Sequence, residues 1–286
     1  MTKNTLVIAV LLLGMLSFAE TPGNVTRKQP AEAAAKWSKE NALAGIDRNA
    51  SSTDCAFSFN SGSGFTTLSY CVTASGNITK FETPAGHPLI STSLGEGYGV
   101  CDASGAVAYS DFGGFGDSGN WGEAKVVSHD ATSVQIARTT GDGIWTLTQT
   151  IRQGTTPPAA KIVMALTNNS KQTRSAFVMR YVDVDADGSL TNNLDATHNS
   201  ALGWNSATGN EESAAFGLEL QNQGTAQGDV STGFIQDTPN PPAPCDAFAH
   251  SVQGPVVSTD GSLVMFYEPV VHSHKTVTMT TAYKGW

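Results

Sequence analysis

The stretch between Thr132 and Arg152 constrains the fold most, because its apolar residues recur at every second position. Val134 and Ile136 alternate with polar residues, and Gly141-Asp142-Gly143 supplies a tight turn. The apolar residues that share one face of the return strand are Trp145, Leu147 and Ile151. A period of two is typical of a strand with one buried face, so this stretch predicts a β-hairpin.

Three further strand pairs are predicted from similar patterns. They are segment 66–83, which turns at Gly76-Asn77; segments 160–170 and 174–185, which flank a turn at Asn168-Asn169-Ser170; and segments 262–270 and 275–285. Thr and Val crowd these runs, as strand preferences require, and about a dozen strands are expected in all. We therefore expect an all-β fold, a large antiparallel β-sandwich that forms one domain from residue 54 to residue 286.

The start of the chain has the features of a secretory signal peptide. Lys3 supplies the positive charge at the N-terminus, and residues 6–16 form an apolar run that is too short to span a bilayer comfortably. Ser17-Phe18-Ala19 follows, with small residues at the −3 and −1 positions of a signal-peptidase site. We expect cleavage after Ala19, and the alternative is an uncleaved anchor. The protein is then secreted, periplasmic or extracellular, with no membrane attachment after cleavage.

Residues 20–53 differ in composition from the rest of the chain. They are rich in Ala, Lys and Glu, and the run from Pro30 to Gly45 is typical of one helix. Proline is favoured at the first turn of a helix and glycine just past its end. We expect an N-terminal helical spacer.

The charge of the chain is negative and unevenly placed. The net charge is −9, and between Tyr181 and His274 there is no lysine or arginine, although twelve Asp and Glu residues fall there. Such a chain is a poor partner for nucleic acid. The acidic segment is either a solvated surface or a region that requires a divalent cation such as calcium.

The cysteines predict two disulfides. Four are present, at Cys55, Cys71, Cys101 and Cys245, and an even number in an exported protein favours full pairing. Four cysteines allow three pairings. We favour Cys71–Cys101, because both lie in strand-like runs that flank one loop, with Cys55–Cys245 as the second bond.

The succession WTLTQTIRQG (145–154) and AKIVMALTNNSKQTRSAFVMRYVDVD (160–185) resembles the β-supersandwich of galactose-mutarotase-like and glycoside-hydrolase-associated domains. The resemblance implies a large antiparallel sandwich, often concerned with carbohydrate. The catalytic His and Glu of that family have no matching motif in this chain, so the resemblance assigns no catalytic residue.

The stretch YVDVDADGSL (181–190) predicts a calcium site. Its three alternating aspartates and Gly188 resemble the first half of the calcium loops of EF-hand and dockerin modules, although the twelfth position is Leu194 and the flanks look like strand. The expected ligands are Asp183, Asp185, Asp187, the carbonyl of Ser189, and Asp195. The alternative is an acidic turn that leaves a strand into solvent.

A glycine-rich loop, residues 111–122, is the candidate glycan-binding region. Its aromatic residues are Phe112, Phe115 and Trp121, which could stack on sugar rings or fold back on the edge of the sandwich. Glu96 lies between glycines and could join them, or could pair with Asp111 or Asp117 as a glycosidase acid and base about 5–9 Å apart.

Two classes of function therefore remain. The first is a secreted, non-catalytic module with a structural calcium site that binds a glycan or a cell-surface partner. The second is a carbohydrate-active enzyme, a glycoside hydrolase or an epimerase-like protein. We favour the module, because no complete catalytic set can be assembled. An enzyme should gather Glu96, Asp111 or Asp117 and an aromatic residue in one concave pocket.

Overall fold

The computed structural model describes residues 54–90, 95–113, 117–154, 158–197, 199–205, 216–224, 231–236, 241–250, 252 and 254–286. The expected signal peptide (1–19) and helical spacer (20–53) lie outside these residues. In the described part of the chain, no helix has the length and the apolar character that a membrane span requires.

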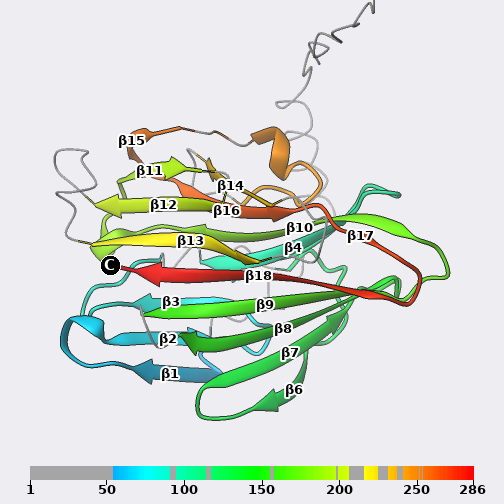
Figure 1. Cartoon of the computed structure of the whole chain (residues 1–286), viewed down its shortest axis with the longest axis horizontal. Coiled ribbons are helices and arrows are strands. Elements are labelled where there is room, and N and C mark those ends of the chain that lie inside the picture. The colour runs from blue at the N-terminus through cyan, green and yellow to red at the C-terminus, as the bar shows by residue number, and fades with distance from the viewer. Residues whose placement is uncertain are drawn as a thin grey trace, which may run out of the picture.

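The largest sheet has nine strands, all paired antiparallel, and Figure 1 shows it running from β15 at the top to β6 at the bottom. In spatial order the strands are β15 (Val256–Thr259), β11 (Asn192–Ala196), β12 (Ser200–Asn205), β13 (Phe216–Gly224), β18 (Thr276–Gly285), β9 (Ala159–Asn168), β8 (Trp145–Gly154), β7 (Ser133–Thr139) and β6 (Lys125–His129).

Two smaller antiparallel sheets complete the described fold. The six-stranded sheet contains β14 (Ser231–Gln236), β16 (Ser262–Tyr267), β10 (Arg174–Asp183), β4 (Glu96–Asp102) and β5 (Val107–Asp111), with β17 (Val270–Val271) paired to β10. The three-stranded sheet contains β1 (Phe57–Ser61), β2 (Leu68–Val72) and β3 (Ile78–Glu82). Short 3-10 helices lie at η1 (Gly64–Thr66), η3 (Ala186–Gly188) and η5 (Ala247–His250).

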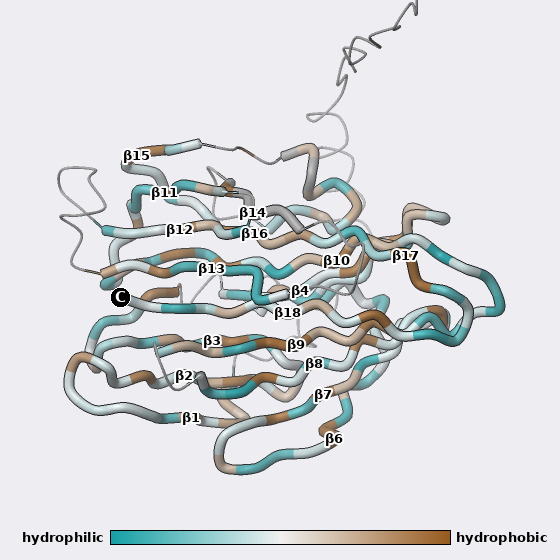
Figure 2. Tube along the Cα trace, viewed as in Figure 1, coloured by the Kyte–Doolittle hydropathy of each residue, from teal (hydrophilic) through white to brown (hydrophobic). Residues whose placement is uncertain are grey.

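The period-two pattern is the reason for these sheets. Burial alternates residue by residue along β7, β8 and β9, so each strand turns one face to the core. One hydrophobic cluster joins side chains from all three sheets, and hydrophobic residues recur along the strands in Figure 2. The expected all-β, large antiparallel β-sandwich is confirmed.

The six-stranded sheet is covered on both faces near its centre. Every residue of β4 is buried, and so are residues 178–183 of β10. One face joins the main core, and a second cluster on the other face contains Phe112, Met179, Tyr181, Ala247, Val264 and Phe266. A strand covered on both faces has no alternation of burial, which is why its partners could not be deduced from periodicity.

The hairpins at 66–83 and 132–152 are confirmed, since β2 pairs with β3 and β7 pairs with β8. The other two predicted strand pairs are wrong. β9 pairs with β8 and β18, whereas β10 pairs with β4 and β16 in the six-stranded sheet. Likewise β16 pairs with β10 and β14, and β18 pairs with β9 and β13. In a sandwich, successive strands can cross from one sheet to the other, so nearness in sequence does not ensure pairing.

Both disulfides exist, but the favoured pairing is wrong. The bonds are Cys55–Cys71 and Cys101–Cys245, and no free cysteine remains among the four, all of which are described. Cys71 on β2 pairs in register with Ser58 on β1, and Cys55 comes three residues before Ser58. Cys101 lies in another sheet. Its neighbour on the same face of β4 is Gly99, where a Cβ would overlap Pro244, so the segment that carries Cys245 lies on this face.

The tyrosines give a test of this packing. All six tyrosines of the chain are buried, and burial is the main cause that raises the pKa of each above its ordinary value of 10.0. A phenol whose folded pKa is raised stabilises the fold below pH 10, and this contribution is lost as the pH rises toward the folded pKa. We expect ultraviolet absorbance to detect no phenolate near pH 10, and then a cooperative ionisation together with unfolding. Gradual ionisation centred near pH 10 with an unchanged circular dichroism spectrum would contradict this packing.

Candidate functional site

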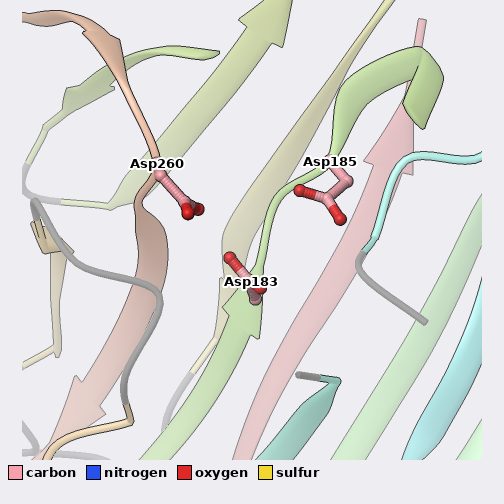
Figure 3. A group of neighbouring side chains, drawn as sticks. All are labelled: Asp183, Asp185 and Asp260. Atoms are coloured by element: carbon pink, nitrogen blue, oxygen red, sulfur yellow. The ribbon is translucent and has the colours of Figure 1, made fainter. Parts of the chain in front are cut away.

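Three aspartates from two distant parts of the chain come together at one end of the six-stranded sheet. Each of Asp183, Asp185 and Asp260 offers a carboxylate oxygen, and these oxygens all lie within 4.8 Å of one another. The three carboxylates point toward a shared space (Figure 3). Asp183 is buried, with 1% of its surface exposed. We name Asp183, Asp185 and Asp260 the aspartate cluster.

Strand pairing creates the aspartate cluster. Asp183 is the last residue of β10 and stands opposite Ser262, the first residue of β16. Asp260 comes two residues before that position, so the antiparallel register brings it beside the end of β10. The backbone N–H of Val184 donates to the carbonyl of Gly261 at 3.4 Å. This hydrogen bond extends the contact between the two segments one residue beyond the end of β10.

The loop that follows β10 is held by its own hydrogen bonds. The side-chain amide of Asn192 donates to the carbonyls of Val184 and Ser189, both at 2.8 Å, and its oxygen accepts the N–H of Ala186 at 3.2 Å. The N–H of Asp185 donates to the carbonyl of Leu89 at 3.3 Å. These bonds fix the backbone that carries Asp185, so the geometry of the aspartate cluster is set by the fold.

Only two of the five expected calcium ligands belong to the aspartate cluster. Asp187 turns away with φ 57° and forms a hydrogen bond of 2.7 Å with Nδ1 of His87. The carbonyl of Ser189 accepts from Asn192, and Asp195 on β11 accepts the N–H of Ala196 at 2.8 Å. The contiguous ligand set of Asp183, Asp185, Asp187, Ser189 and Asp195 stays a prediction, of which the structure gathers only Asp183 and Asp185 around one point. Asp260 was not among the expected ligands, because only the pairing of β10 with β16 places it beside Asp183.

The electrostatics of this corner are dominated by negative charge. Tyr181, next to the cluster, has a pKa raised well above its ordinary value, first by burial and then by the negative charge of Asp183, with further contributions from Asp260 and Asp185. Its hydroxyl accepts a hydrogen bond from Ser262 at 3.0 Å. The three carboxylates thus add to the effect of burial and disfavour a further negative charge at Tyr181.

A second polar cluster is an ion pair in the interior. Glu96 at the start of β4 and Arg180 on β10 are both fully buried. Nη2 of Arg180 lies 2.8 Å from Oε2 of Glu96, and Nε contacts Oε1. Oε1 also accepts from the hydroxyl of Tyr283 at 2.6 Å, and Oε2 accepts from the N–H of Ile78 at 2.7 Å. The remaining guanidinium nitrogen reaches the side chain of Gln149. Both carboxylate oxygens are thus occupied by donors.

A third cluster joins the other two acids that were candidates for glycosidase chemistry. Arg138 on β7 places Nη1 2.7 Å from Asp111 and Nη2 2.5 Å from Asp117. Its guanidinium lies over the ring of Trp121, 5.5 Å from the centroid, and also donates to the hydroxyl of Tyr98 at 3.3 Å. All three charged groups are at most 7% exposed. Asp111 and Asp117 thus lie near aromatic rings, as expected for a carbohydrate-active enzyme. Both acids are nevertheless buried in the interior and paired with Arg138.

The three candidate glycan-binding residues that the structure describes do not form an exposed platform. Phe112 is 2% exposed and packs edge-on against Tyr181, with ring centroids 5.6 Å apart. Trp121 is 8% exposed, and Glu96 is fully buried. Phe115 lies outside the described residues. The expectation that Phe112, Trp121 and Glu96 contact a sugar is corrected, because the rings fold back on the sandwich, as the alternative had it.

Comparisons with known proteins show the fold alone. No protein-family model matches the chain, and no curated protein matches it. A bacterial glucoamylase, solved in complex with acarbose, is similar with a TM-score of 0.54 at 7% identity, covering 82% of this chain and 33% of that one. The described chain thus spans about a third of that enzyme.

Two further similar structures are matched over nearly their whole length, with lower TM-scores. A putative aldose 1-epimerase from Escherichia coli K12 has a TM-score of 0.46 at 11% identity, covering 80% of this chain and 99% of that one. A galactose mutarotase-like protein from Lactobacillus casei has a TM-score of 0.42 at 8% identity, covering 80% and 100%. The expected resemblance to galactose-mutarotase-like and glycoside-hydrolase-associated proteins is confirmed as a likeness of fold.

Proposed function

We propose that this protein is an exported, non-catalytic β-sandwich module that binds one calcium ion at the aspartate cluster and recognises a carbohydrate. The observation that carries the proposal is the convergence of Asp183, Asp185 and Asp260. The calcium site is structural, because it ties the end of β10 to the segment that enters β16. The glycan part rests on the likeness of fold, which is an analogy.

The geometry of the aspartate cluster suits calcium. Calcium binds oxygen at about 2.3–2.6 Å, so two ligands of one ion lie at most about 5 Å apart. The oxygens of the cluster lie within 4.8 Å of one another. Carboxylates without imidazole or thiolate favour calcium over transition metals. Calcium takes six to eight oxygens, so carbonyls and water would complete the shell.

The negative charge of the segment from residue 181 to residue 274 is a second argument for a bound cation. Carboxylates this close repel one another, and Asp183 is 1% exposed, so water screens its charge poorly. The sequence from residue 181 to residue 274 contains no lysine or arginine. A divalent ion would convert this repulsion into coordination.

The buried ion pairs support a non-catalytic role over a carbohydrate-active enzyme. A glycosidase needs one carboxylic acid that can give its proton to the leaving group and one free carboxylate. Glu96 is held by Arg180 and Tyr283, and Asp111 and Asp117 are held by Arg138. These bonds fix the carboxylates in the interior. The two disulfides support export, since such bonds persist in oxidising compartments.

Thermal unfolding tests the calcium site. Calcium at about 100 times its Kd should stabilise the folded state by about 2.7 kcal/mol, which corresponds to a rise in Tm of about 5–10 °C. Asp183→Asn and Asp260→Asn should abolish most of this rise. Asp187→Asn is the matched control, because Asp187 bonds to His87 outside the cluster, and it should keep the full rise.

The same variants separate loss of calcium binding from loss of folding. In chelator, Asp260→Asn should melt at or above the temperature of the wild type, because it removes one of three repelling charges. If Asp187→Asn lost the rise in Tm with calcium and Asp260→Asn kept it, calcium would bind to the contiguous loop 183–195. The proposal that the aspartate cluster binds calcium would then be wrong.

A further inference from the structure

The outer face of the three-stranded sheet contains a pocket that the calcium site does not involve. Its volume is about 450 Å³, and its walls include Ser58, Asn60, Ser69, Thr79, Lys80 and the Cys55–Cys71 disulfide. Pockets that bind small molecules commonly measure about 300–1,000 Å³. The volume therefore suits a small ligand.

Strand alternation explains why this face is polar. On the inner face, Phe59, Tyr70 and Phe81 are register partners across β1, β2 and β3, and their rings stack with centroids 5.1 and 6.3 Å apart. The next residue on each strand must point outward. Asn60 and Ser69, also register partners, accordingly lie on the outer face and line the pocket.

The chemistry of the pocket suits a neutral sugar. Hydroxyls of Ser69 and Thr79 and the amide of Asn60 can donate and accept hydrogen bonds to sugar hydroxyls, whereas the hydroxyl of Ser58 lies 3.0 Å from Sγ of Cys55. The disulfide adds a less polar surface for the C–H face of a ring. Lys80 adds a donor, and its ammonium is 3.8 Å from Glu82, which offsets its charge. The side chain of Lys80 is 57% exposed, and an ion pair in water is weak. The ammonium of Lys80 therefore remains available to a ligand.

An aromatic side chain stands at the end of the same hairpin. Phe65, in the turn that joins β1 to β2, is 91% exposed. The turn is ordered by hydrogen bonds, since the N–H of Thr66 donates to the carbonyl of Ser63 at 3.1 Å and the hydroxyl of Thr67 donates to Gly64 at 2.7 Å. An aromatic ring that is held in water on an ordered turn gains from a partner that covers it.

We propose that the outer face of the β1–β2–β3 sheet binds a neutral mono- or disaccharide in this pocket, and that Phe65, which does not line the pocket, contacts the second ring of a disaccharide at the end of the hairpin. The inference deepens the glycan part of the proposed function and rests on it. It is independent of the aspartate cluster, which lies at the junction of β10 and β16.

Binding of simple sugars to the full chain tests the proposal. Methyl α-glucoside, methyl β-galactoside, maltose and lactose would be titrated by calorimetry in calcium and in chelator, with amide chemical shifts followed by NMR. We expect at least one sugar to bind, with shifts concentrated at Asn60, Ser69 and Lys80. Asn60→Ala, Lys80→Met and Phe65→Ala should each weaken binding about tenfold.

Matched variants remote from the pocket provide the controls. Leu190→Ala removes an apolar side chain that is 67% exposed, and Lys275→Met removes an exposed ammonium, so both should keep the affinity of the wild type. Binding that resists both Asn60→Ala and Lys80→Met, or shifts confined to other strands, would overturn the pocket but leave glycan recognition in place. Binding of none of the four sugars would overturn both, whereas the calcium site is decided separately by its effect on Tm.

Discussion

Replacing Arg180 with methionine should lower the free energy of unfolding by about 3–5 kcal/mol, because it leaves the carboxylate of Glu96 buried without its counter-charge. Both side chains are 0% exposed, so water cannot replace the lost partner. Equilibrium unfolding in urea with the disulfides intact measures the change. The loss should come mainly from the unpaired charge and less from the attraction itself.

A double-mutant cycle separates these two contributions. Glu96→Gln alone should also destabilise, but the double variant Glu96→Gln/Arg180→Met should lose less than the sum, with a coupling of about 0.5–3 kcal/mol. Lys284→Met is the control, since Lys284 lies 3.7 Å from Glu219 with both side chains about a fifth exposed, and it should cost under about 1 kcal/mol. A cost as small for Arg180→Met would show that the pair is not desolvated in the folded protein.

Removing the Cys101–Cys245 disulfide should destabilise the fold more than removing Cys55–Cys71. The two bonds join cysteines that are 144 and 16 residues apart in sequence. On loop-closure entropy a bond across about 15 residues stabilises by about 3 kcal/mol, and one across about 100 residues by about 4.7 kcal/mol. The longer bond also holds the segment at Pro244 against β4. Urea unfolding of the two double Cys→Ala variants measures the difference.

Peptide mapping under non-reducing conditions supplies the control for the disulfide prediction. The digest should contain cross-linked peptides for Cys55–Cys71 and Cys101–Cys245. A peptide that joins Cys71 to Cys101 would contradict the pairing, and an equal loss of stability in the two variants would contradict the loop argument.

The sequence predicted what local periodicity determines. The hairpin around Gly141-Asp142-Gly143 follows from alternation on both sides of a glycine turn, and its two strands pair with each other directly across that turn. The partners of β10 and β18 depend on which sheet each strand joins, and this is decided by burial of both strand faces and by long-range packing. The disulfide pairing failed for the same reason, because Cys101 and Cys71 lie in different sheets.

The candidate calcium site shows the same limit. Asp183 and Asp185 were found because alternating aspartates stand out in a sequence, whereas Asp260 is an ordinary residue until β16 pairs with β10. Asp187 fitted the spacing of a loop motif, but a left-handed backbone turns it to His87. Sequence spacing describes a ligand set only where the ligands come from one segment.

The most direct test of the calcium site is the amount of calcium bound per chain after equilibrium dialysis, measured by elemental analysis. We expect about one ion per chain in the wild type and in Asp187→Asn, and almost none in Asp183→Asn or Asp260→Asn. Wild-type protein that retains no calcium after dialysis against millimolar calcium would contradict the account, and the three aspartates would then be an acidic corner of the sheet.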